Sequence, residues 1–176
     1  NSSSAAWNNV ANMMTVFGQD SPEVWNYIES LLRNEMVITT SSSVCFKAVA
    51  EGEYVVGLTY EDGASTLLKS GATNIKMVYP KEGASGFAFG LAIIKDAPHM
   101  DAAKAMANYL MSPEGQSYMG NALGTLRFTN PKAKYESPYL PADSEINWVV
   151  RDNKWLSENK EKILTHWNEL YVTIHG

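Results

Sequence analysis

Two clusters of serine residues are the first candidates for chemistry in this chain. Both are triplets of consecutive residues: Ser2, Ser3 and Ser4, and then Ser41, Ser42 and Ser43. Each triplet stands where a helix is expected to begin, and a helix N-terminus presents unpaired backbone N–H groups and a partial positive charge. Serine hydroxyls there complete a site for phosphate, phosphonate or carboxylate. The alternative for each triplet is capping alone, because serine is a favoured N-cap residue.

An acidic turn is the second candidate. Glu61 and Asp62 lie between Tyr60 and Gly63, directly after the β-rich segment 54–59. Because α/β folds bind ligands at the ends of their strands, we expect these carboxylates near the serines, where they would hold an amine, a sugar hydroxyl or a metal ion. The structural alternative is that Asp62 caps the next helix while Glu61 lies in solvent. Together, the two groups predict one small ligand that the serines bind at its anionic end and the carboxylates bind at its other end.

Other residues carry weaker signals. Phe87 and Phe89 flank a glycine-rich crossover and are candidates to line a cleft, with core packing as the alternative. Cys45 stands beside Phe46 with no histidine nearby in the sequence, which favours a small core residue over a nucleophile. The three histidines share no metal-binding spacing, and the glycine-rich run 83–86 is not a nucleotide-binding loop.

Composition excludes several functions. The 14 basic and 19 acidic residues give a net charge of -5 and a pI near 5.2, which disfavours nucleic acid and anionic membranes as partners. The single cysteine excludes an internal disulfide and supplies no zinc motif. No nucleophile with its base, and no carboxylate pair at convincing spacing, indicates catalysis. We therefore predict a protein that is not an enzyme and needs no cofactor.

The elements that would position these residues alternate along the chain. Short β-rich segments are predicted as strands at 36–39, 54–59, 75–79 and 87–94. Helices are predicted up to Gly18, after Ser21, from the second serine triplet to Gly52, over 64–70, over 102–111, from Ser112 to Gly124 and over about 154–171. This alternation is typical of an α/β fold with a largely parallel or mixed sheet flanked by helices.

Several segments together carry a family resemblance. They are NSSSAAW at 1–7, SSS at 41–43, KAVAEGEY at 47–54, VGLTYED at 56–62, YPKEG at 79–83, LAIIK at 91–95, LMSPEGQ at 110–116 and WNEL at 167–170. Their order resembles the ferric-iron and phosphonate branch of the type II periplasmic binding proteins. The resemblance implies two α/β lobes joined by a hinge that close on a ligand. Residues 1–80 and 124–176 would form the C-terminal lobe, while 81–123 would supply a crossover strand and helices to an N-terminal lobe.

The resemblance also implies a function. The chain would be the solute-binding component of an ABC importer, extracytoplasmic, either periplasmic or lipid-anchored, and partnered by permease subunits. Iron-binding members present adjacent tyrosines where this chain has only Tyr60, followed by Glu61 and Asp62. An organophosphonate or sugar phosphate is therefore the preferred solute. The alternatives are ferric iron, with Tyr60 and Glu61 as metal ligands, and a ligand-sensing domain of a signalling protein.

The resemblance finally suggests self-association. The chain begins on a helix cap, so we expect that something preceded Asn1 in a longer parent and that most of the N-terminal lobe is missing here. Without the rest of that lobe, Phe87–Ile94 would be an apolar strand with no neighbouring strand to pair with. Chains cover such a strand by domain swapping or by association with a second copy. We therefore expect a domain-swapped or associated homodimer.

Overall fold

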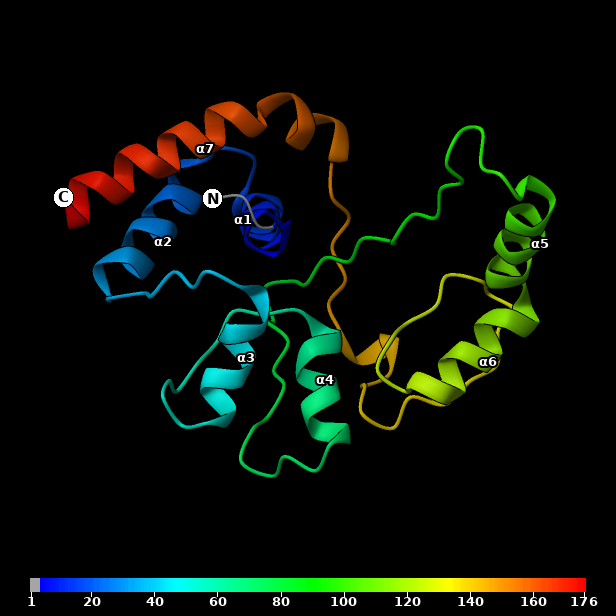
Figure 1. Cartoon of the computed structure of the whole chain (residues 1–176). Helices are drawn as coiled ribbons and strands as arrows, with labels where there is room; N and C mark the ends of the chain where they lie inside the picture. Colours follow the sequence, from blue (N-terminus) through cyan, green and yellow to red (C-terminus); the bar gives the residue numbers. More distant parts are fainter. Residues whose placement is uncertain (1–3) are drawn as a thin grey trace. The chain divides into compact units, whose positions relative to one another are not determined.

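The computed structural model describes residues 4–176, and its regular elements are helices (Figure 1). They are α1 (Ser4–Phe17), α2 (Pro22–Arg33), α3 (Ser42–Ala50), α4 (Glu61–Lys69), α5 (Met100–Met111), α6 (Pro113–Leu123), the 3-10 turn η1 (Asp143–Glu145) and α7 (Asn153–His175). The chain divides into two units. Unit 1 contains the described residues up to Tyr60 together with Val78–Gly86 and Ile146–Gly176, and unit 2 contains Glu61–Met77 and Phe87–Glu145. The assignment of 1–80, 81–123 and 124–176 to two family lobes stays a prediction.

The predicted α/β sheet is wrong for the described part of the chain. None of the four β-rich segments is a strand, and within residues 4–176 the only β pairing is an isolated parallel bridge between Ala84 and Trp148. A strand exists only when another strand supplies its hydrogen bonds, whereas the residue pattern reports a local preference alone. The β-rich segments instead lie at the surface, with Val55 95% and Phe89 82% exposed.

Local helix signals predicted the helix ends more reliably. Ser21 Oγ accepts a hydrogen bond from the Val24 amide at 3.3 Å, which caps α2 ahead of Pro22. Helix α6 ends at Gly124, whose φ of 65° is left-handed and suits glycine. The predicted turn over 60–63 is wrong, because Glu61 already begins α4.

The core of unit 1 lies between α1, α2 and α7 (Figure 1). Each helix contributes buried apolar side chains at the spacing of one helical face, as the sequence predicts. The buried set is Val10, Ala11, Met13, Met14, Val24, Trp25, Ile28, Leu32, Leu156, Ile163 and Trp167. None of the helices within residues 4–176 combines the length and the apolar character needed to cross a membrane.

A polar network ties α1 to two distant segments of unit 1. Arg151 donates from Nε to Ser85 Oγ at 2.6 Å and from Nη1 to Asn8 Oδ1 at 2.6 Å. Ser85 Oγ donates in turn to Asn12 Oδ1 at 2.5 Å. Burial lowers the pKa of the Arg151 guanidinium from its usual range. The network therefore fixes the segment before α7 against α1 and the loop at 83–85.

Unit 2 is built around α6. Gly120 lies against the ring of Tyr135, whose hydroxyl accepts a hydrogen bond from the Phe128 amide at 2.8 Å. The buried Gln116 accepts from the Asn130 amide at 2.8 Å. These contacts hold the irregular segment 128–136 against the helix, although its sequence shows no periodicity of its own.

Candidate functional site

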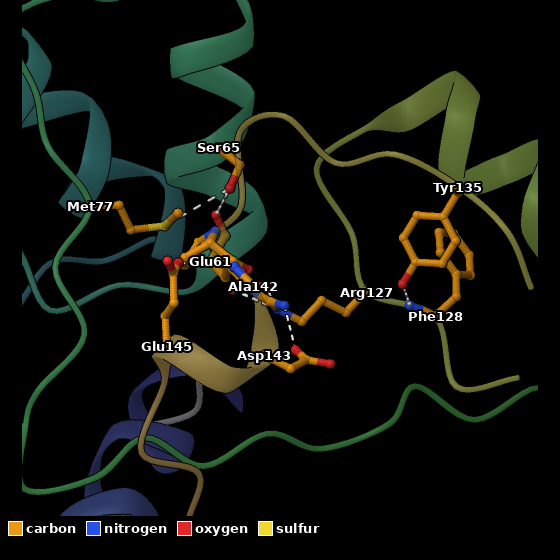
Figure 2. A network of polar contacts seen from close by, with 10 residues as sticks. Glu61, Ser65, Met77, Arg127, Phe128, Tyr135, Ala142, Asp143 and Glu145 are labelled. Atoms are coloured by element: carbon orange, nitrogen blue, oxygen red, sulfur yellow. Dashed lines mark hydrogen bonds and ion pairs between the residues drawn. The ribbon is translucent and has the colours of Figure 1, made fainter. Parts of the chain in front are cut away.

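Glu61 is held by an arginine 66 residues away in the sequence. Arg127 Nε donates to both Glu61 carboxylate oxygens, at 2.9 and 3.1 Å, while Nη1 donates to Asp143 Oδ1 at 2.5 Å and Nη2 to the Pro141 carbonyl at 2.8 Å (Figure 2). The side chains of Glu61 and Arg127 are each 23% exposed, whereas that of Asp143 is 75% exposed. All three guanidinium nitrogens therefore have an acceptor, and the Glu61 carboxylate is fixed in orientation.

Asp62 also bonds to the segment that carries Arg127. Thr125, whose residue is 4% exposed, donates from Oγ1 to Asp62 Oδ1 at 2.7 Å. Asp62 lies inside the first turn of α4, one residue after Glu61, so it does not occupy the N-cap position. Consecutive acidic residues at the start of α4 thus contact Thr125 and Arg127, and both carboxylates lie near the positive end of that helix dipole.

The second serine triplet begins α3 in unit 1. Ser41 is the N-cap residue, and Ser42 and Ser43 occupy the first turn, both partly exposed. The Ser41 side chain makes no capping hydrogen bond; its Oγ lies 3.1 Å from Ser43 Oγ. Within the described chain, the first turn of α3 contains no acidic residue. The hydroxyls of Ser41 and Ser43 therefore bond to each other and not to the backbone amides of the first turn.

Tyr60 packs on the same helix. Its ring meets that of Phe46 edge-on, with centroids 5.6 Å apart, and Tyr60 remains 41% exposed. The neighbouring Thr59 hydroxyl is buried without a hydrogen-bond partner within the described residues. In unit 1 the structure therefore brings Tyr60 to α3, the helix that begins with Ser42 and Ser43.

The remaining predicted site residues lie apart from these groups. Phe87 belongs to unit 2, is 52% exposed and meets Phe89 edge-on at 5.4 Å. Ser2 and Ser3 lie outside the described residues, and Ser4 is the first residue of α1. Ser42, Ser43 and Tyr60 belong to unit 1, while Glu61 and Asp62 belong to unit 2. The expected convergence of serines and carboxylates on one ligand stays a prediction.

Sequence reasoning missed Arg127, Thr125 and Phe46. Arg127 is one of only three arginines, and it stands in a proline-rich stretch with no helical periodicity. That setting was a usable signal. The planar guanidinium group of an arginine donates several hydrogen bonds in a geometry that suits a carboxylate, so a carboxylate elsewhere in the fold was a candidate partner for Arg127. Among residues 4–176, no three His, Cys, Asp or Glu side chains gather closely enough to hold a metal ion.

Comparison with known proteins defines the class. The family described as bacterial extracellular solute-binding protein matches residues 1–146, which is most of the chain. The chain belongs to this family of bacterial extracellular solute-binding proteins. No curated protein and no solved structure matches it.

The general function of the chain follows from its family. A protein of this class binds a small-molecule solute outside the cytoplasm and serves as the substrate-binding component of an ABC-type transporter, with the permease as its partner. Such proteins in general carry their solute without transforming it, in line with the prediction of a protein that is not an enzyme.

Proposed function

We propose that the solute is a small anion of the organophosphonate or sugar-phosphate class. In this proposal the N-terminus of α3, with Ser42 and Ser43, receives the anionic group in unit 1, and Tyr60, which packs on Phe46 of the same helix, is a further contact. Glu61, Asp62 and Phe87 are proposed ligand contacts of unit 2, as Ser2, Ser3 and Ser4 are at the start of the chain. Capture by closure of two lobes, and a periplasmic or lipid-anchored location, belong to the same proposal.

A difference between helix starts supports the anion. Helices α2, α6 and α7 are capped by Ser21, Ser112 and Asp152, whose side chains accept from backbone amides at 3.3, 3.0 and 2.9 Å. Helix α3 begins within a serine triplet, yet its N-cap side chain makes no such bond, and neither does His99 at the N-cap of α5. Because a helix N-terminus attracts negative charge, an anionic ligand at α3 would supply what side chains supply at α2, α6 and α7.

Thermal unfolding with added ligands tests the proposal. A ligand that binds only the folded state raises the melting temperature. We expect 2-hydroxyethylphosphonate, 2-aminoethylphosphonate or glycerol 3-phosphate, each at millimolar concentration, to raise it, and polyamines to leave it unchanged. Ferric citrate tests the alternative in which Tyr60 and Glu61 bind iron. If iron alone raised the melting temperature, the anion proposal would be wrong.

Variants of α3 test the location of the anion. Replacing Ser42 and Ser43 by alanine together should weaken the ligand roughly tenfold, since two hydroxyl donors are lost. Ser43→Asp should abolish binding while leaving the helix as stable as before, because the new carboxylate would itself occupy the positive helix end. Ser30→Ala, on the exposed side of α2, is the matched control and should bind normally. Normal titration of both α3 variants would place the anion elsewhere.

We also propose that the segment Phe87–Ile94 mediates self-association into a homodimer. All its residues are exposed, with Phe89 82% and Ile94 81% exposed, and it is rich in aromatic and β-branched residues. Light scattering at increasing concentration should show a dimer that Phe89→Lys and Ile94→Lys disrupt. A monomer at millimolar concentration would exclude this assembly.

A further inference from the structure

We propose that a cluster of side chains around Trp25 makes the contact between α2 and α7 pH-sensitive, so that this contact is stronger in mildly acidic solution than in alkaline solution. The cluster consists of Asp20, Trp25, Lys162 and His166, all in unit 1, where α2 and α7 pack on each other (Figure 1). The protonated imidazole of His166 is the stabilising form. The inference goes beyond the proposed function, since it does not depend on which solute the chain binds.

The cluster is built on the indole ring of Trp25, a residue of α2 that is 9% exposed. The imidazole ring of His166 on α7 lies over that indole, with ring centroids 3.8 Å apart and planes tilted by 29°. Trp25 Nε1 donates to Asp20 Oδ1 at 2.7 Å, and Lys162 Nζ donates to Oδ2 of the same carboxylate at 2.5 Å. The carboxylate of Asp20 therefore joins the indole to α7, one helical turn before His166.

A positive charge on His166 is stabilised by two groups that the fold holds in place. A cation over the face of an indole is attracted by the negative potential of that face. The hydrogen bonds from Lys162 and then from Trp25 lower the pKa of Asp20 most, and the charge of His166 also lowers it. Because this attraction is mutual, the Asp20 carboxylate favours the protonated imidazole. In the unfolded chain neither group is held beside His166, so protonation favours the folded state.

The charges on α7 do not cancel this effect. Lys162 repels a protonated imidazole, but its side chain is 67% exposed, so water screens the repulsion. Three negative side chains line the same exposed face of α7 as His166, and they are Glu158, Glu161 and Glu169. Their charges favour the protonated form. His166 is itself exposed, so its charged form remains in contact with water and burial opposes it only weakly.

The charges at α2 leave the sign unchanged. Glu29 and Arg33 form an ion pair at 2.7 Å, and Glu23 adds a negative charge in the first turn of the helix. The side chain of Asp20, in the turn before α2, is 22% exposed, so its attraction to His166 is screened less than the repulsion from the more exposed lysine. The charged groups around the imidazole therefore favour its protonation.

Urea unfolding followed by tryptophan fluorescence at about pH 5.5 and about pH 8 tests the inference. An ordinary imidazole titrates near pH 6.5, so it is mostly protonated at the first pH and neutral at the second. His166→Gln removes the titrating group and keeps a polar side chain. The substitution should raise the equilibrium constant of unfolding roughly threefold more in the acidic solution than in the alkaline one, which is the scale of a cation–indole contact at an exposed site.

Two further variants separate charge from packing. His166→Arg introduces a permanent positive charge on a planar group that stacks on an indole. The difference in stability between His166→Arg and His166→Gln should therefore be the same in both solutions. His99→Gln, at the N-cap of α5 in unit 2, is the matched control. It should leave the unfolding of unit 1 unchanged in both solutions.

The direction of the pH dependence decides the outcome. If His166→Gln changes the unfolding constant by the same factor in both solutions, or by more in the alkaline one, His166 acts through packing alone and the inference is wrong. If His166→Gln does not fold, the original chain is compared with His166→Arg. The original chain should then lose stability relative to the arginine variant, roughly threefold in the unfolding constant, between the acidic and the alkaline solution. A constant difference between these two proteins would equally overturn the inference.

Discussion

Replacing Arg151 by methionine should destabilise unit 1, because its guanidinium group makes partly buried hydrogen bonds. Arg151 joins three segments that are far apart in the sequence: α1 through Asn8, the loop at Ser85 and the chain just before α7. Methionine preserves much of the apolar stem of the side chain. The substitution therefore removes the guanidinium donors while retaining most of the packing.

The expected cost follows from the acceptors left behind. The Asn8 side chain at 2.6 Å and Ser85 Oγ at 2.6 Å would both lose a charged donor, and the Asn8 carbonyl at 3.1 Å would lose a weaker one. A polar group that loses its partner in a partly buried site costs about 1–3 kcal/mol. Burial of the charged guanidinium group is itself unfavourable, as the lowered pKa of Arg151 indicates. The methionine variant removes this penalty, which offsets part of the cost of the lost hydrogen bonds. We expect a net loss of about 2–4 kcal/mol in the free energy of unfolding.

Tryptophan fluorescence in urea is the appropriate assay. All five tryptophans belong to unit 1: Trp7, Trp25, Trp148, Trp155 and Trp167. Their signal therefore reports the unit that contains Arg151. Arg151→Lys should lower the free energy of unfolding by less than Arg151→Met does, because lysine keeps the positive charge. It should still be less stable than the original chain, because lysine cannot make the same set of hydrogen bonds.

A matched control makes the result decisive. Arg33→Met removes the same charge from an ion pair whose side chains are 61% and 37% exposed, and it should cost less than about 0.5 kcal/mol. If Arg151→Met lowered the free energy of unfolding no more than Arg33→Met, the hydrogen bonds of Arg151 would contribute little to the stability of unit 1. The reasoning from burial would then be wrong.

Two further predictions concern packing and pH. Gly120→Ala should destabilise unit 2 by about 1–3 kcal/mol, because the new methyl group would lie 2.5 Å from Tyr135 Cβ. Hydrogen exchange of the α6 amides measures this loss of stability. Gly90→Ala is the neutral control, because a methyl group there meets nothing within 4 Å. The hydrogen bond from Lys162, and then that from Trp25, lower the pKa of Asp20, so its contribution to stability is present above the ordinary aspartate pKa and is lost as the pH falls through the lowered one. Asp20→Asn should therefore cost less than about 1 kcal/mol at pH 7, because the Lys162 side chain of this ion pair is 67% exposed. The difference in urea unfolding should disappear as the pH falls through the lowered pKa of Asp20.

The helices were predictable because their determinants lie close together in the sequence. Ser21 and Pro22 specify the start of α2, and Gly124 specifies the end of α6, through contacts within a few residues. The buried positions of α1, α2 and α7 follow from the helical period alone. The sheet was not predictable in this way. A residue such as Val55 favours an extended backbone wherever it stands, but a strand also needs a partner that no local pattern identifies.

The acidic candidates show the same limit at the level of a site. Glu61 and Asp62 were recognisable as residues suited to binding, but the partners that determine their chemistry come from 125–127, more than 60 residues later. Read alone, two adjacent carboxylates indicate a site for a cation. Held by Thr125 and Arg127, the same carboxylates accept hydrogen bonds within a partly neutralised group. The charge at the start of α4 is therefore set by the two segments together, and neither segment predicts it alone.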